Sequence, residues 1–150
     1  MRLAVASDHG GFRLKAEIIK FLEDRSIEFE DLGTYSEESV DYPDFALALA
    51  QSVASGRNSL GIVCCGTGIG VSISANKVPG VRAALCHDPY SARMAREHND
   101  ANVIALGERV VGPGLALEIV GAFLEGEFQG GRHSRRVDKI CGIEKKYCKD

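Results

Sequence analysis

Short apolar runs alternate with longer segments of helical spacing along the whole chain. Five apolar runs predict β-strands, over residues 3–7, 27–32, 60–65, 81–86 and 102–106. After them, apolar residues recur every three or four positions. This spacing predicts helices over 12–22, 45–54, 71–76, 89–98 and 113–123, and a last helix from about residue 133. Strands and helices that alternate in this way form a parallel sheet with helices on both faces.

The alternation predicts one α/β domain over residues 1–150. We expect a three-layer αβα, Rossmann-like, doubly wound fold around a parallel sheet of about five strands. The run 27–32 carries alternating acidic residues, so we expect it at an edge. Asp88 and Pro89 mark a helix start, because aspartate is a good N-cap and proline suits the first helical position. Residues 126–150 are a glycine-containing connector and a last helix, which we expect to dock on a partner subunit.

A glycine-rich turn follows the third strand. Cys65 ends the strand, and Gly66, Gly68 and Gly70 follow it in alternation. Glycines let the chain turn sharply and let a ligand approach the amides, and a helix that starts here would attract negative charge. The same field favours thiolate over thiol, so a cysteine in this place can be reactive. The alternative is a plain strand-to-helix turn with a buried thiol.

Spacing excludes three familiar uses of such a turn. Position 71 holds valine, whereas a cysteine-type phosphatase requires arginine there and a dinucleotide fingerprint requires its third glycine. No Gly-Lys-Ser or Gly-Lys-Thr sequence occurs, which excludes a Walker loop. A cysteine beside an anion cradle, with the hydroxyl of Thr67 in its middle, suits the stabilisation of an oxyanion on a small ligand.

Polar residues follow other strands as well. Because parallel strands end at one edge of the sheet, we expect the loops at 8–9, 65–66, 87–88 and 107–109 to gather there. We place Asp41-Tyr42-Pro43 and His98-Asn99-Asp100 at the same rim, although alone each could be a turn or a helix cap.

Three arginines crowd the start of the last helix, at positions 132, 135 and 136. That end of the helix dipole disfavours cations, so the cluster is electrostatically odd. A bound anion would explain it. A solvated basic patch is the alternative.

Composition sets limits on the class of protein. The chain has 150 residues, of which 45% are hydrophobic and 26% charged, as in ordinary globular proteins. Its formal net charge of −3 argues against a nucleic-acid or membrane-surface role, and no apolar run reaches the roughly 20 residues of a membrane span. Five cysteines without metal-ligand spacing, and a chain that begins directly with a strand, predict a cytoplasmic protein.

Six short motifs occur in the order of a known family. They are Asp8-His9-Gly10-Gly11, Asp41-Tyr42-Pro43, Cys65-Gly66-Thr67-Gly68-Ile69-Gly70, Asn76-Lys77, His98-Asn99-Asp100-Ala101-Asn102 and Gly130-Gly131-Arg132-His133. Over essentially its whole length the chain resembles the ribose-5-phosphate isomerase B family, which includes the galactose-6-phosphate isomerase subunits. The resemblance implies an aldose–ketose isomerase that uses no metal or other cofactor and works through a cis-enediolate.

The same resemblance assigns roles to individual residues. Cys65 would be the base that moves a proton between C1 and C2, and Thr67 would assist at the sugar oxygens. The amides of Gly66, Gly68 and Gly70 would hold the enediolate charge, and Asp8 and His98 would take part in ring opening. The sugar would be bound by Tyr42 and Asn99, and its phosphate by His9, Arg109, Arg132 and Arg136.

The resemblance also implies a homodimer, or a tetramer, whose active sites are shared between subunits. His98 and Asn99 would come from the other subunit, with Arg109 as a further candidate for that side. The chain holds the full catalytic set, which favours a homomeric ribose-5-phosphate isomerase. Cys65 and Val71 place it in the cysteine-base branch rather than the branch with a catalytic glutamate.

Substrate size stays open at this point. A six-carbon sugar phosphate, allose 6-phosphate or galactose 6-phosphate, is an alternative to ribose 5-phosphate. A non-catalytic phosphosugar-binding module would need the cradle and the arginines but no base, so the presence of Cys65 favours the enzyme.

Overall fold

The computed structural model describes residues 1–148. Its five strands form one parallel sheet in the order β2-β1-β3-β5-β4. The strands are β1 (Leu3–Ser7), β2 (Phe29–Asp31), β3 (Leu60–Cys65), β4 (Ala83–Leu85) and β5 (Val103–Gly107). The helices are α1 (Phe12–Asp24), α2 (Tyr42–Ala54), α3 (Ile69–Ala75), α4 (Pro89–Asn99), α5 (Pro113–Glu125) and α6 (Arg132–Tyr147), with a 3-10 turn, His9–Gly11, before α1.

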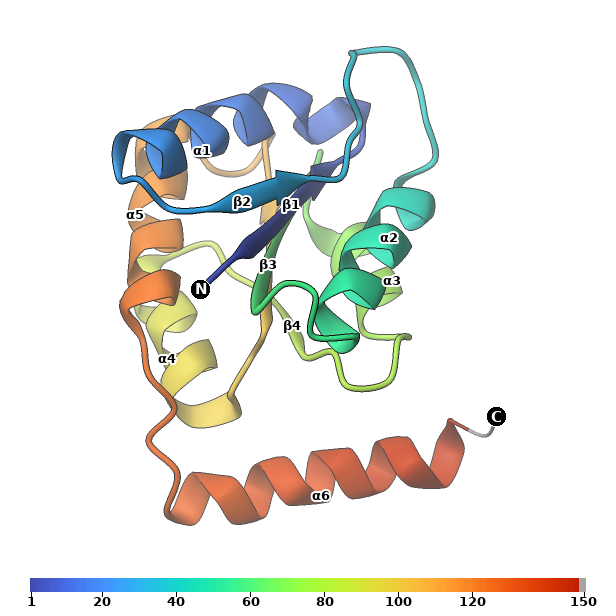
Figure 1. Cartoon of the computed structure of the whole chain (residues 1–150), viewed down its shortest axis with the longest axis vertical. Helices are drawn as coiled ribbons and strands as arrows, with labels where there is room; N and C mark the ends of the chain where they lie inside the picture. Colours follow the sequence, from blue (N-terminus) through green and yellow to red (C-terminus); the bar gives the residue numbers. More distant parts are fainter. Residues whose placement is uncertain (149–150) are drawn as a thin grey trace.

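The direction of each connection decides which helix covers which face (Figure 1). A right-handed crossover places its helix on one face when the chain steps one way along the sheet, and on the other face when it steps back. The steps from β1 to β2 and from β4 to β5 run one way, and those from β2 to β3 and from β3 to β4 run the other way. Accordingly, α1, α4 and α5 pack over one core, whereas α2 and α3 pack over a second. The predicted three-layer, doubly wound fold is confirmed.

Burial follows the position of each strand in the sheet. Every residue of β1, β3 and β5 is buried, whereas the three-residue strands β2 and β4 at the two edges are half-buried. The predicted edge position of β2 is confirmed. Both edge strands are shorter than predicted, since an edge strand has a pairing partner on one side only.

Local signals explain most helix starts. The Asp88 carboxylate accepts the Ser91 N–H at 2.7 Å, so the predicted cap of α4 is confirmed. α2 begins at Tyr42 rather than at residue 45, because Pro43 suits the first helical turn. α3 begins at Ile69 rather than at residue 71, directly after a left-handed glycine.

α6 lies outside the three layers (Figure 1). Its buried residues are His133 and Val137. Toward its other end, the Glu144 carboxylate accepts the Gly80 N–H at 3.1 Å. α6 therefore bridges two parts of its own chain, while Ile143 on it stays 61% exposed. Docking of this helix on a partner subunit stays a prediction.

Candidate active site

Three loops meet at the carboxyl edge of the sheet. β1 leads into α1 on one face of the sheet, while its neighbour β3 leads into α3 on the other face. The connections that follow these two strands therefore turn in opposite directions. Such a switch point leaves a crevice beyond the strand ends. The register pairs Ser7 with Cys64 and Cys65 with Gly107, which brings Asp8, Cys65 and the β5–α5 turn together. Of the four loops predicted to gather at this edge, these three meet, whereas the loop at 87–88 follows β4, the edge strand on the far side of β5.

Cys65 stands at the mouth of the glycine turn. Its side chain is 4% exposed, and Sγ accepts the Gly68 N–H at 3.0 Å. The Gly68 N–H orients the sulfur and stabilises a negative charge on it. The neighbouring Cys64 faces the opposite core, where burial raises the pKa of its thiol above the ordinary value. Adjacent positions of one strand thus give two thiols with different surroundings.

Two glycines are required by the way the loops pack. Gly68 has a φ of 78°, and a Cβ there would lie 2.6 Å from Leu85 Cδ1. A Cβ on Gly11 would lie 2.5 Å from the carbonyl carbon of Cys64. The turn before α1 therefore packs backbone against backbone on the end of β3.

The glycine turn leaves backbone donors available. Among residues 1–148, the N–H groups of Gly66, Thr67 and Gly70 find no protein acceptor, whereas the Ile69 N–H donates to Thr67 Oγ1 at 3.2 Å. Backbone N–H groups need an acceptor, and a solvent or ligand oxygen can serve. Several such donors beside a thiol form an array suited to an oxyanion.

Asp8 and His9 follow β1 at the same edge. Asp8 is 6% exposed, and its carboxylate accepts the Gly11 N–H at 3.1 Å. His9 Nδ1 accepts the Val40 N–H at 3.1 Å. A neutral imidazole that accepts at Nδ1 carries its proton on Nε2. The loop before α2 thus fixes His9 in a form that can donate to an anion.

Arg109 and Tyr42 lie over the glycine turn of their own chain. The Arg109 N–H donates to the Gly66 carbonyl at 2.9 Å, and Nη1 lies 3.0 Å from where a Cβ of Gly66 would be. The Tyr42 ring lies 2.6 Å from the corresponding point on Gly70. Arg109 therefore lies on the same side as Cys65 of its own chain. This corrects the expectation that Arg109 reaches the site from the other subunit.

Glu108 connects two of the loops, although nothing in the sequence indicated a role for it. Its N–H donates to the Cys65 carbonyl at 2.9 Å, and its carboxylate accepts the Leu14 N–H at 2.9 Å. α1 has no side-chain cap from its own N-cap residue, so Glu108 supplies one from the β5–α5 turn. No local pattern could reveal this contact, because 94 positions separate the two residues.

His98 and Asn99 do not lie at this edge. They are the last residues of α4, which runs back to the amino end of β5 (Figure 1). A typical strand spans about 17–20 Å, so roughly that distance separates them from Cys65. The expectation that all the motifs share one rim within a chain is wrong. The helix after a parallel strand must return to the opposite edge before the next strand begins.

A second cluster forms around His98 at that far edge. The His98 ring stacks on His133 of α6, with ring centroids 4.1 Å apart and planes inclined by 8°. Arg132 and Arg136 lie one turn apart at the start of the same helix, and both are exposed. Burial, the His98 ring and the two arginines hold the pKa of His133 below its ordinary value. His133 belongs to the motif at residues 130–133, but nothing in the sequence indicated a role for it.

The predicted residues, joined by His133, thus divide into two groups within one chain. The Cys65 half-site comprises Asp8, His9, Tyr42, Cys65, Gly66, Thr67, Gly68, Gly70 and Arg109. The α4–α6 half-site comprises His98, Asn99, Arg132, His133 and Arg136.

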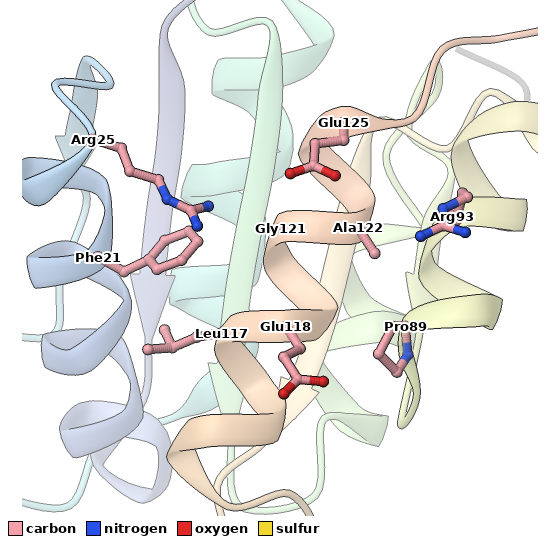
Figure 2. A pocket seen from close by; sticks show the side chains of 9 residues that line it. All are labelled: Phe21, Arg25, Pro89, Arg93, Leu117, Glu118, Gly121, Ala122 and Glu125. Atoms are coloured by element: carbon pink, nitrogen blue, oxygen red, sulfur yellow. The ribbon is translucent and has the colours of Figure 1, made fainter.

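A separate hollow of about 370 Å³ lies between α1, α4 and α5 (Figure 2). The Arg25 guanidinium lies 3.8 Å from the centre of the Phe21 ring in it. Arg93, Glu118 and Glu125 supply its other charges. Two arginines and two glutamates give the hollow no preference for a phosphate, and it contains no residue of either half-site.

Two other kinds of feature are absent from residues 1–148. No three His, Cys, Asp or Glu side chains gather closely enough to hold a metal ion. No helix in this range has the length and apolar character needed to cross a membrane.

Comparisons with known sequences match nearly the whole chain. The family model described as Ribose/Galactose Isomerase matches residues 3–140. Ribose-5-phosphate isomerase B of Escherichia coli is 50% identical over 145 residues, which cover 97% of each chain. D-erythrulose-4-phosphate isomerase of Pectobacterium atrosepticum is 46% identical over 93% of each chain.

Solved structures agree equally well. Ribose-5-phosphate isomerase B of Clostridium thermocellum gives a TM-score of 0.97 at 61% identity, over 99% of this chain and 100% of that one. The enzyme of the same name from Mycoplasma genitalium, with bound ribulose 5-phosphate, gives a TM-score of 0.92 at 44% identity over 97% of each. The chain therefore belongs to the ribose/galactose isomerase family and is a sugar-phosphate isomerase of the type B class.

Proposed function

We propose that the protein interconverts ribose 5-phosphate and ribulose 5-phosphate through a cis-enediolate, with Cys65 as the base. The observation that carries this proposal is the position of the Cys65 sulfur beside the available N–H groups of Gly66, Thr67 and Gly70. Proton transfer next to a carbonyl requires a base and an oxyanion donor array side by side. The names of the Escherichia coli and Mycoplasma genitalium relatives support the choice of substrate.

At the end of the reaction, each catalytic side chain has the same protonation state as at the start. The Cys65 thiolate removes the proton from C2 of the open-chain aldose. The C–H electron pair forms the C1–C2 double bond, and the C1 carbonyl oxygen becomes the enediolate oxygen, held by the amides of the glycine turn. A proton then passes from O2 to O1 with help from the Thr67 hydroxyl. The Cys65 thiol finally returns its proton to C1, which gives the ketose and restores the thiolate.

Two further tasks fall to the other residues. Opening of the furanose ring moves a proton from the C1 hydroxyl to the ring oxygen, and an imidazole can carry protons near neutral pH. We assign this step to His98 with Asp8, and contacts to the sugar hydroxyls to Asn99. His9, Arg132 and Arg136 would bind the phosphate, with Arg109 at the glycine turn. Guanidinium groups suit a dianionic phosphate because they donate two parallel hydrogen bonds.

A homodimer would bring the two half-sites together. One chain holds them roughly a strand length apart, about 17–20 Å, which no single ribose phosphate spans productively. Neither Arg132 nor Arg136 forms a salt bridge within the described part of the chain, so both remain available for an anion. Ile69 and Ile73 form an exposed apolar strip on α3, beside the glycine turn. We infer that the α4–α6 half-site of one subunit covers the Cys65 half-site of its partner.

The test is an isomerase assay of purified protein with a matched pair of cysteine variants. Cys65→Ala should abolish formation of ribulose 5-phosphate, while binding of the sugar phosphate, measured by calorimetry, survives. Cys64→Ala should be nearly silent, because its side chain faces the opposite core. Turnover that is equal in Cys65→Ala and wild type would remove Cys65 as the base.

Parallel assays decide the substrate. Allose 6-phosphate and galactose 6-phosphate test the six-carbon alternative, and erythrulose 4-phosphate tests the substrate named for the Pectobacterium relative. A higher kcat/KM on any of these would reassign the substrate. Binding of all of them without turnover would leave a phosphosugar-binding module, and a chelator should have no effect on the wild-type rate.

A further inference from the structure

The turn that ends α4 has a strained backbone. Asp100, its C-cap, has a φ of 45° and a ψ of 43°, in the left-handed region. Residues other than glycine seldom adopt this region without support, although aspartate and asparagine tolerate it best. The turn redirects the chain from α4 into β5, so its conformation fixes the positions of His98 and Asn99.

Two arginines share the Asp100 carboxylate. Arg82 Nη2 donates to Oδ2 and Arg96 Nη1 donates to Oδ1, both at 3.0 Å. Each oxygen thus accepts a charge-assisted hydrogen bond from a different part of the chain. The side chains of Arg82 and Arg96 are only 21% and 15% exposed, so solvent screens these pairs less than it screens open surface pairs. We call these three residues the Asp100 clamp.

The same arginines also hold the backbone on both sides of Asp100. Arg82 Nε donates to the Asn99 carbonyl at 3.0 Å, and Arg96 Nη1 donates to the Ala101 carbonyl at 2.7 Å. The last carbonyls of a helix have no partner within the helix, so these contacts satisfy groups that would otherwise face water. Three consecutive residues are thereby fixed directly after His98.

We propose that Asp100 is a positioning residue that fixes His98 and Asn99, an inference that rests on the proposed role of His98 in ring opening. The clamp holds the last turn of α4, and this turn holds the His98 ring against His133. Without the carboxylate, the two arginines lose the anion that they share and keep only their hydrogen bonds to the backbone carbonyls of residues 99–101, so the last turn of α4 is held less firmly. His98 then leaves its stack, although Asp100 itself touches neither the substrate nor the ring.

A loss of stability alone would not support the proposal, because any partly buried ion pair can stabilise a fold. The distinguishing readouts are the turnover number and the environment of the His98 ring. The ring signals of His98 and His133 in NMR spectra report the stack directly, since each ring lies in the field of the other.

Two variants separate the effect of the backbone conformation at position 100 from the effect of the carboxylate charge. Asp100→Gly removes the carboxylate and adopts the left-handed conformation freely. Asp100→Asn keeps the size, tolerates the conformation and removes the charge. Glu30→Gln is the matched control, since it weakens the Glu30–Arg57 pair, whose Nε–Oε2 distance is 3.0 Å, outside both half-sites.

We expect Asp100→Gly to lower kcat for ribose 5-phosphate by roughly ten- to a hundredfold, as is typical when a catalytic group is misplaced. The His98 and His133 ring signals should shift at the same time. Asp100→Asn should show a smaller change in both readouts, and Glu30→Gln should match wild type in both. An unchanged kcat in folded Asp100→Gly, or a lower kcat with unmoved ring signals, would overturn the proposal.

If Asp100→Gly fails to fold, the same two readouts on Asp100→Asn decide the question. His98→Asn separates this inference from the function on which it rests. Wild-type turnover in His98→Asn would remove the ring-opening role of His98. The ring signals of the Asp100 variants would still show whether Asp100 positions that side chain.

Discussion

The His98 ring of α4 stacks on the His133 ring of α6, with centroids 4.1 Å apart and planes inclined by 8°. Two protonated imidazoles repel each other at such a distance. Burial, together with His98 and the arginines at 132 and 136, holds the pKa of His133 below its ordinary value. His133 therefore binds a proton less readily in the folded protein than in the unfolded chain.

His133→Phe should flatten the dependence of stability on pH. The pKa of His133 is lower in the folded than in the unfolded chain, where it is about 6.5. The contribution of His133 to the free energy of unfolding is intact above that pH. It is lost as the pH falls, because the unfolded chain then binds the proton more readily than the folded chain does. Phenylalanine keeps a ring in the stack but binds no proton. Urea midpoints of both proteins at about pH 8 and about pH 5.5 test this, and equal losses on acidification would contradict it.

Mixed dimers should recover activity from two inactive chains. Cys65→Ala and His98→Asn each damage a different half-site, so a hybrid of the two contains one intact site if the sites are shared. Activity is measured after mixing under subunit-exchange conditions, with hybrids verified by mass spectrometry. Absence of recovery despite proven hybrids would place the whole site within one chain.

Arg132→Ala and Arg136→Ala should each raise KM by about an order of magnitude or more while the fold stays intact. The estimate follows from the loss of a charge-assisted contact worth about 1.5–3 kcal/mol. Both side chains are exposed, so their removal leaves no cavity. Lys145→Ala is the control, because it removes a cation from the far end of α6. An unchanged KM in both arginine variants would show that the phosphate binds elsewhere.

The five cysteines should differ sharply in reactivity. Burial raises the pKa of Cys86 to about 11 and also raises that of Cys64, so at about pH 8 both are almost entirely thiol. Among the cysteines other than the proposed base Cys65, Cys148 is the exposed one and should be alkylated first by iodoacetamide in the native protein. Peptide mapping after a time course measures the order. Labelling of Cys64 before Cys148 would contradict the described burial.

The sequence predicted the features that depend on neighbouring residues. The apolar run that ends at Cys65 is a strand buried on both faces, and Asp88 caps the helix that follows β4. Valine at position 71 excluded phosphatase and dinucleotide sites. Motifs spread over the whole chain then indicated the family, which the comparisons show.

Contacts between distant segments could not be predicted in this way. The motif at residues 98–102 looks like part of one rim in the sequence, but α4 carries it to the opposite edge of the sheet. The hydrogen bond from Arg82 to Asp100 joins residues 18 positions apart, and the one from Leu14 to Glu108, which caps α1, joins residues 94 positions apart. Such pairs follow from the strand order, which the alternation of strands and helices does not specify.

The bond between Glu108 and the first turn of α1 has a consequence for ligand binding. It ties the β1–α1 loop to the β5–α5 turn, while the Glu108 N–H ties the latter to the Cys65 carbonyl. His9 and Arg109 therefore sit on one preorganised frame rather than on three independent loops. Ligand binding then loses little conformational entropy on this side of the crevice, and more of the intrinsic affinity appears as measured affinity.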